Sequence, residues 1–180
     1  MKLVILDRDG VINKDSDDFI KSVDEFIPYA DSLDAIARLN HAGYTVAIAT
    51  NQSGIGRGYY NETTLAAMHE KLQALLAPLN GHIDLITYCP HHPDANCNCR
   101  KPKPGLLNQI ANHFQTDLSE AILVGDSRRD LDAARAVGAK PILVKTGKGE
   151  GTLARGEGLE NVPVYDHLLA FVEDLLVAKI

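Results

Sequence analysis

The sequence of 180 residues has few cysteines, no long apolar run and no excess of basic residues. No apolar stretch approaches the roughly 20 residues that a helix needs to cross a bilayer. The N-terminus has one lysine and a short apolar run before Asp7, which does not fit a secretory signal. Without an export signal, the cytoplasm is the expected compartment.

The shortage of basic residues also bears on partners. A net charge of −6 and a pI near 5.6 argue against sequence-independent nucleic-acid binding, which depends on clustered Lys and Arg. A chain this acidic needs a local basic pocket to bind an anionic substrate. Its length fits a single domain over 1–180, with no repeat or linker. We expect a monomer, because no long exposed apolar stripe is evident.

The few cysteines are clustered: all three lie between residues 89 and 99. An odd, clustered set in a chain without an export signal favours metal binding over disulfides. Three thiols and an imidazole form a typical structural zinc set, tetrahedral and closed. The predicted zinc ligands are Cys89, His91, Cys97 and Cys99, with the adjacent His92 as the alternative histidine. A closed zinc would fix the loop that carries Arg100 and Lys101, and would not take part in catalysis.

Short apolar runs alternate with amphipathic helical patterns along the chain. The runs predict strands over 3–6, 44–49, 83–88, 121–124 and 141–144, with an edge strand over 162–165. Helices are expected from Asp31 or Ser32 to Gly43, over 61–79, 104–114 and 130–137, and from an Asp166 cap to 176. This alternation predicts an α/β fold with a doubly wound, Rossmann-like parallel sheet. Residues 11–28 and 147–151 are expected to be mobile loops, and His69 and His167 to be solvated.

Polar groups follow four of the predicted strands. They are Asp7 and Asp9, Thr50 and Asn51, Arg100 and Lys101, and Asp126. Ligands of open parallel sheets bind outside the carboxyl ends of the strands, so these groups should converge. Phosphoryl transfer requires a nucleophile, an acid and cations, and this set supplies them.

Asp7 can attack phosphorus, and Asp9 can protonate the leaving group and then activate water. Carboxylate oxygens of Asp7 and Asp126 suit Mg²⁺. The order D-x-D-G, Thr, Lys and G-D resembles the haloacid dehalogenase superfamily of phosphatases. That resemblance implies that Asp7, Asp9, Thr50 and Lys101 are catalytic and that Asp7, Asp9 and Asp126 surround Mg²⁺. Lys103 is a rival for the catalytic lysine.

Five blocks carry a finer resemblance, to the heptose 1,7-bisphosphate phosphatase family. They span 7–13, 50–58, 89–93, 97–105 and 124–127. The resemblance implies removal of a sugar 7-phosphate in the synthesis of the activated heptose of lipopolysaccharide. It also implies substrate contacts from Asn51, Arg100 and Ser127, although other members carry lysine at position 127.

Neither 11–28 nor 89–104 is long enough for a large cap domain, so the site should be open. Histidinol-phosphate phosphatase is the nearest rival, since it shares the fold, the aspartates and the zinc loop. A zinc-stabilised binding module without catalysis is the rival from another class. The sequence leaves the anomer at C1 open.

Overall fold

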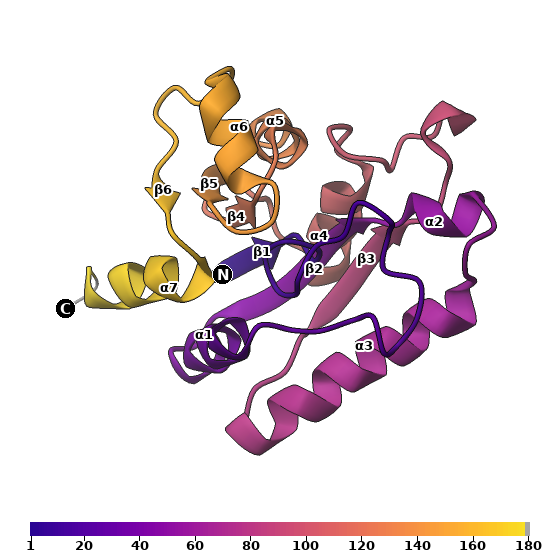
Figure 1. The fold of residues 1–180 in the computed structure, drawn as a ribbon. Coiled ribbons are helices and arrows are strands. Elements are labelled where there is room, and N and C mark those ends of the chain that lie inside the picture. The colour runs from indigo at the N-terminus through magenta and orange to yellow at the C-terminus, as the bar shows by residue number, and fades with distance from the viewer. Residues whose placement is uncertain (179–180) are drawn as a thin grey trace.

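The computed structural model describes residues 1–178, and a six-stranded parallel sheet lies at its centre (Figure 1). Its strands are β1 (Leu3–Leu6), β2 (Thr45–Asn51), β3 (Leu85–Cys89), β4 (Ile122–Gly125), β5 (Lys140–Val144) and β6 (Val164–Tyr165). They are ordered β3-β2-β1-β4-β5-β6, with every pair parallel. The predicted doubly wound α/β sheet is confirmed.

Strand β1 is buried on both faces, which explains its unbroken apolar sequence. Val4 and Leu6 pack into one hydrophobic cluster, and Leu3 and Ile5 pack into a second cluster on the opposite face. Each side chain of β1 therefore contributes to a core, and a polar residue can enter only after Leu6. The first carboxylates of the site, Asp7 and Asp9, therefore come directly after β1.

Helices cover both faces of the sheet. Helices α1 (Ala30–His41), α3 (Glu62–Leu76) and α7 (Leu168–Val177) supply the first cluster, while α4 (Gly105–Phe114) and α5 (Arg128–Ala136) supply the second. In Figure 1, α1, α3 and α7 lie along the lower side of the sheet. The remaining short helices are α2 (Ser53–Gly56), η1 (Ala77–Leu79), η2 (Pro93–Ala95) and α6 (Gly149–Arg155).

The position of β1 determines where the site lies. The chain winds from β1 through β2 to β3 on one side, and then crosses to β4, β5 and β6 on the other. The carboxyl ends of β1, β2 and β4 are therefore neighbours, at the crossover where doubly wound sheets bind ligands. Residues 7–29 contain no helix or named strand, so no cap domain is inserted after β1, as predicted.

Two predicted loops are more ordered than expected. Residues 149–155 form helix α6, although three glycines lie between 147 and 151. Gly149 is there because a Cβ at this position would collide with the carbonyl oxygen of Val144. The segment 11–28 is anchored in the core by Ile12, Ile20 and Phe26, each at most 5% exposed. Gly149 thus provides close approach to β5, and Gly147 provides close approach to Gly10 and Asp126.

Helix starts also differ from the prediction. Helix α1 begins at Ala30, after Tyr29, and α5 begins at Arg128 with Ser127 as its N-cap. Helix α7 is capped by His167, whose Nδ1 accepts from the Ala170 N–H, and not by Asp166. His167 is therefore a cap and not a free solvated side chain.

No helix within residues 1–178 is both long and apolar enough to cross a membrane. The single-domain assignment over 1–180 stays a prediction, and its last two residues lie outside the described part of the chain.

The prediction that His69 on α3 is solvated is wrong. Its side chain is buried and not solvated, with Nε2 3.3 Å from Nη1 of Arg8. Burial and the Arg8 guanidinium lower the pKa of the imidazole from 6.5 to about 4. Because His69 lies four residues after Leu65 and three before Leu72, it falls on the same buried stripe.

This burial predicts acid sensitivity. As pH falls from 6.5 towards 4, the unfolded chain binds a proton at His69 that the folded chain excludes, so the free energy of unfolding falls. The loss should reach about 3 kcal/mol, from about 1.36 kcal/mol per pKa unit. His69→Gln lacks this proton uptake, so urea titrations across the pH range should show the wild-type curve falling more steeply. Parallel curves for the two proteins would contradict the assignment.

Candidate active site

A cavity of about 340 Å³ opens at the carboxyl ends of the central strands. Six of the residues singled out in the sequence line it: Asp7, Asp9, Thr50, Asn51, Arg100 and Asp126. Three strands and the loop after β3 deliver these side chains to one place, as the strand-end pattern predicts. The convergence creates a polar cavity with carboxylates at its base and arginines among its lining.

Lys101 lies beneath the cavity and is 3% exposed. Its Nζ is 3.0 Å from Oδ1 of Asp7 and 2.6 Å from Oδ1 of Asp130, and it donates to the carbonyl oxygen of Ala49 at 2.7 Å. Burial alone would lower the pKa of Lys101, but the carboxylates of Asp130 and Asp7 raise it above its usual value. Lys101 is therefore a buried, permanently charged ammonium beside the predicted nucleophile.

Asp130 is a member of the site that the sequence reading missed. Its carboxylate is 1% exposed, and its Oδ2 accepts from the backbone N–H groups of Asp126 and Ser127 at 3.2 Å. The signal for it was the spacing G-D-S-R-R-D, in which a second acid follows Asp126 by one helical turn. Asp130 joins the start of α5 to Lys101 and so fixes both.

Asp126 follows β4 and faces the residues after β1. Its Oδ2 accepts from the Lys148 N–H at 2.9 Å, and its carbonyl oxygen accepts from Thr152 Oγ1 at 2.8 Å. Gly10 has a φ of +89°, and a Cβ there would collide with the Asp126 carboxylate. The glycine of D-x-D-G is thus required by the contact between these two segments.

The carboxylates of Asp7, Asp126 and Asp130 form a cluster with ligand atoms within 4.8 Å of one another. Burial, reinforced by Asp130, raises the pKa of Asp7 well above its usual range and that of Asp126 to about 7. The single charge of Lys101 cannot balance three carboxylates around one point, so a further cation would relieve the repulsion that remains. The oxygen-only donor set fits a hard divalent cation such as Mg²⁺.

Asp9 lies outside this carboxylate cluster. Its Oδ1 accepts from Arg8 Nε and Asn13 Nδ2, both at 2.9 Å, and its Oδ2 faces Gln52 Nε2 at 3.3 Å. Its predicted role as a magnesium ligand stays a prediction without support from its carboxylate position. Asp9 does line the cavity beside Asp7, where an acid and base can act.

Of the other predicted residues, Thr50 and Asn51 line the cavity, whereas Ser127 and Lys103 do not. Thr50 is buried and its Oγ1 accepts from Gln52 at 2.9 Å, while the Asn51 amide bonds the Lys101 backbone in both directions, at 3.0 and 3.1 Å. Ser127 is not among the cavity-lining residues, and its hydroxyl donates to Asp130. Its predicted contact with substrate stays a prediction. Lys103 is exposed and donates to the Cys97 carbonyl, so the geometry favours Lys101 over it.

Three cationic side chains that the sequence reading did not single out also line the cavity. They are Arg57, Arg129 and Lys148, which join Arg100. Lys148 is paired with Asp15 at 2.7 Å, whereas Arg100 and Arg129 have no carboxylate partner among the described residues. Burial, with the nearby Arg129 and Arg57, lowers the pKa of Arg100. The cavity therefore contains both cations and carboxylates, and its arginines provide positive charge for an anionic substrate.

The cysteine loop forms the second candidate metal centre. Cys89, His91, Cys97 and Cys99 place their ligand atoms within 4.8 Å of one another. Burial and the neighbouring sulfurs raise the pKa of Cys99 to about 12, so these thiols cannot all ionise without a cation. The side chain of His92 instead accepts from the Asp94 N–H and caps η2, which favours His91 as the ligand.

The buried ion pairs predict a specific cost of mutation. Lys101→Met leaves Asp7 and Asp130 without their cation and should lower the free energy of unfolding by about 3 to 5 kcal/mol. The double variant Lys101→Met/Asp130→Asn removes one of the orphaned charges and should recover part of that loss. Urea titration measures both. A Lys101→Met cost within about 0.5 kcal/mol of zero, as at an ordinary surface site, would contradict the pairing.

Comparisons with known proteins agree with this geometry. A family model described as "HAD-hyrolase-like" matches residues 98–171. The chain is 57% identical, over 98% of its length and 100% of the relative, to the D-glycero-beta-D-manno-heptose-1,7-bisphosphate 7-phosphatase of Pseudomonas putida. It is 56% identical to that of Neisseria meningitidis serogroup B, covering 98% of this chain and 95% of that protein.

A solved structure shows the same fold. The crystal structure of D,D-heptose 1,7-bisphosphate phosphatase from Bordetella bronchiseptica, complexed with magnesium and phosphate, superposes with a TM-score of 0.96, at 51% identity over 99% of both chains. The sequence identity extends over nearly the whole chain. With its four strand-end motifs gathered around one cavity, the chain belongs to the D-glycero-β-D-manno-heptose-1,7-bisphosphate 7-phosphatase family of the haloacid dehalogenase superfamily.

Proposed function

We propose that this chain hydrolyses the 7-phosphate of D-glycero-β-D-manno-heptose 1,7-bisphosphate, through an aspartyl-phosphate intermediate, in the synthesis of the activated heptose of lipopolysaccharide. The observation that carries the proposal is the pairing of Asp7 with buried Lys101 at 3.0 Å, next to Asp9, in a member of this family. The β anomer follows the names of the relatives.

In the first step, a carboxylate oxygen of Asp7 attacks phosphorus and the bond from phosphorus to the C7 oxygen breaks. Asp9 donates its proton to that oxygen, so the sugar leaves as an alcohol. Lys101 holds the Asp7 carboxylate in place and keeps positive charge beside it.

In the second step, water attacks the aspartyl phosphate and the bond between phosphorus and Asp7 breaks. Asp9, now a carboxylate, takes a proton from that water and returns to its starting state. Thr50 and Asn51 line the cavity, which supports a role for the Thr50 hydroxyl and the Asn51 amide as donors to the equatorial phosphoryl oxygens.

Asp7 and Asp126 are the residues that would hold magnesium. When bound, this ion neutralises charge on the phosphoryl group and removes the repulsion among the carboxylates. The raised pKa values of Asp7 and Asp126 support a cation at this position.

The rest of the cavity fits an anionic leaving group. Arg57, Arg100 and Arg129 converge there, and Arg100 and Arg129 have no carboxylate partner among the described residues. Cations held close together without counter-ions are arranged for an anion that arrives with the substrate. The phosphate on C1 of the heptose supplies that anion.

The test is phosphate release with Mg²⁺, comparing the β and α heptose 1,7-bisphosphates with histidinol phosphate. We expect kcat/KM for the β anomer to exceed that for histidinol phosphate about 100-fold or more, equivalent to about 2.7 kcal/mol, because only the bisphosphate has a second anion for the arginines.

Asp7→Asn is the matched control, since it keeps the size of the side chain but not the nucleophile. It should abolish turnover while binding of the bisphosphate persists. Preference for histidinol phosphate would overturn the substrate assignment but not the chemistry. A wild-type chain without turnover, whose binding of the bisphosphate is unchanged in Asp7→Asn, would indicate a binding module without catalysis.

We also propose zinc as the ion of the cysteine loop. Three thiolates and one imidazole are the donors of closed structural zinc sites. The loop leads directly into Arg100 and Lys101, so the ion would fix the direction of both side chains.

Zinc content per purified chain tests this proposal, with adjacent histidines as a matched pair. His91→Ala should lose zinc and lower the melting temperature, because binding at structural sites contributes to folding. His92→Ala should retain it, since that side chain caps η2 instead. The reverse result would move the ligand to His92, and no zinc in the wild-type chain would refute the site.

A further inference from the structure

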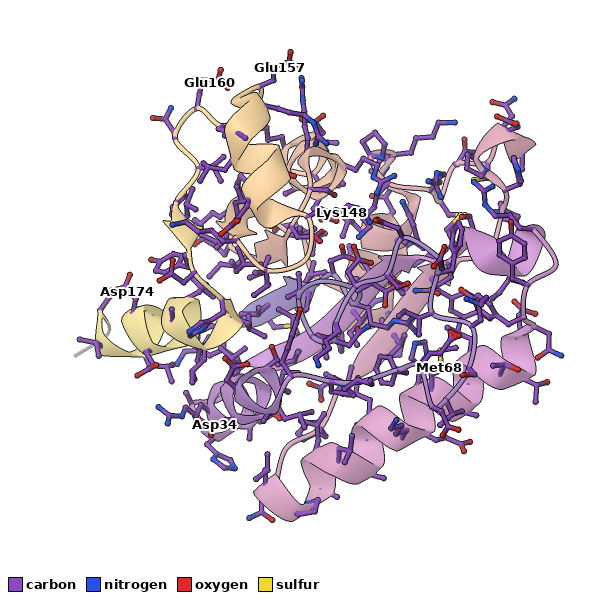
Figure 2. The ribbon with its side chains drawn as sticks, in the orientation of Figure 1. Asp34, Met68, Lys148, Glu157, Glu160 and Asp174 are labelled. Carbon is purple, nitrogen blue, oxygen red and sulfur yellow. The ribbon has the colours of Figure 1, made fainter. Side chains whose placement is uncertain are left out.

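Arg8 lies between the two aspartates of the strand-end motif, yet it points away from the cavity. Its side chain is completely buried, with the guanidinium 4.9 Å from the centre of the Phe26 ring. Figure 2 labels Met68 on α3, one of the residues that Arg8 reaches. A buried guanidinium is costly unless every N–H group and the charge have partners.

Each nitrogen of the Arg8 guanidinium has at least one acceptor. Nε and Nη2 both reach Oδ1 of Asp9 at 2.9 Å, and Nη2 also reaches Oε1 of Gln52 at 3.4 Å. Nη1 lies 3.4 Å from the Met68 sulfur and 3.3 Å from Nε2 of His69. Asp9 is the only anion in this set, so the guanidinium is dedicated to that carboxylate.

Because an arginine can only donate, its partners must accept. Nε2 of His69 therefore carries no proton, in agreement with a pKa lowered to about 4. Oε1 of Gln52 accepts from Arg8 and from the Tyr60 hydroxyl, which directs Nε2 of Gln52 towards Thr50 and Asp9. The orientation of the whole network follows from Arg8.

The two oxygens of Asp9 are consequently unequal. Oδ1 accepts from Nε of Arg8 and Nδ2 of Asn13, both at 2.9 Å, so its lone pairs are occupied, and Nη2 of Arg8 lies 2.9 Å from the same oxygen as an ion pair. Oδ2 has one longer contact, 3.3 Å to Gln52. The Asp9 side chain is 24% exposed and lines the cavity, so Oδ2 is the oxygen that a substrate can reach.

We infer that Arg8 is a positioning residue that, together with Asn13, occupies Oδ1 of Asp9 and thereby makes Oδ2 the oxygen that exchanges the proton. The inference rests on the proposed function, in which Asp9 is the acid and base. The proton moves from Oδ2 to the leaving oxygen as the phosphorus–oxygen bond breaks. In the second half, the proton of the attacking water returns to Oδ2 as the Asp7–phosphorus bond breaks.

The test uses Arg8→Lys, which keeps the charge but lacks the planar guanidinium that reaches Asp9 and Gln52 together. A misplaced acid harms an alkyl phosphate, whose alkoxide must be protonated, far more than a nitrophenyl phosphate, whose phenolate leaves unaided. We expect kcat/KM for the alkyl ester to fall about 10- to 100-fold further than that for the aryl ester. The ratio of kcat/KM values covers only the steps up to leaving-group departure, so hydrolysis of the intermediate does not enter it.

A double-mutant cycle separates positioning from folding. On an Asp9→Asn background, Arg8→Lys should leave the alkyl-to-aryl ratio unchanged, because the group on which it acts is gone. The exposed pair Arg38–Asp34 on α1 offers the matched control, and Arg38→Lys should change neither ester. Equal losses for both esters in Arg8→Lys would show a merely structural role and overturn the inference.

Asn13→Leu is the second variant, because it removes the other donor to Oδ1 while the arginine stays. If Arg8→Lys fails to fold, Asn13→Leu must still shift the alkyl-to-aryl ratio in the same direction, and an unchanged ratio would refute the inference. Both simple esters are assayed without the heptose, so an error in the proposed sugar would leave this result intact. A wild-type chain that hydrolyses no ester would overturn the proposed function and the inference together.

Discussion

The site depends on one buried ammonium. Lys101 comes from the loop after β3, yet its three N–H groups are used by Ala49 on β2, Asp7 after β1 and Asp130 on α5. These segments are far apart in the sequence, and their meeting at one atom requires the strand order in which β1 lies between β2 and β4. Removal of one partner leaves buried charge unpaired, so the same interaction both positions Asp7, the proposed nucleophile, and stabilises the fold.

Because no cap domain covers the cavity, the segments that line it must be held in place by contacts with the buried elements beneath them. The segment 7–29 crosses the catalytic edge of the sheet as irregular chain, but Ile12, Ile20 and Phe26 anchor it in the core. On the other side, the cysteine loop returns through Arg100 to Lys101 and binds Asn51 in both directions. Both segments that line the cavity are thus fastened to buried elements, and the opening between them remains free for the proposed sugar substrate.

The sequence was informative where one local pattern carried the chemistry. Apolar runs followed at once by Asp7, Thr50 and Asp126 predicted both the parallel sheet and the edge at which the site lies. Asp130 was missed because an acid in the first turn of a helix is usually a capping residue, and only the fold shows that it reaches Lys101. Helix α6 was missed because its glycines resemble a loop, whereas Gly149 serves a contact with β5 that local sequence does not encode.

Two buried cations serve the two aspartates of the motif, and their residue types are not interchangeable. Lys101 is a point charge whose three N–H groups diverge towards two carboxylates and a carbonyl, as a site shared by three segments requires. The planar guanidinium of Arg8 donates through Nε to Oδ1 of Asp9 and holds Nη2 2.9 Å from the same oxygen, which fixes the direction of that carboxylate as well as its charge. A nucleophile needs only a position and a negative charge. In the proposed mechanism Asp9 must also direct its proton, and the fixed guanidinium of Arg8 would supply that direction.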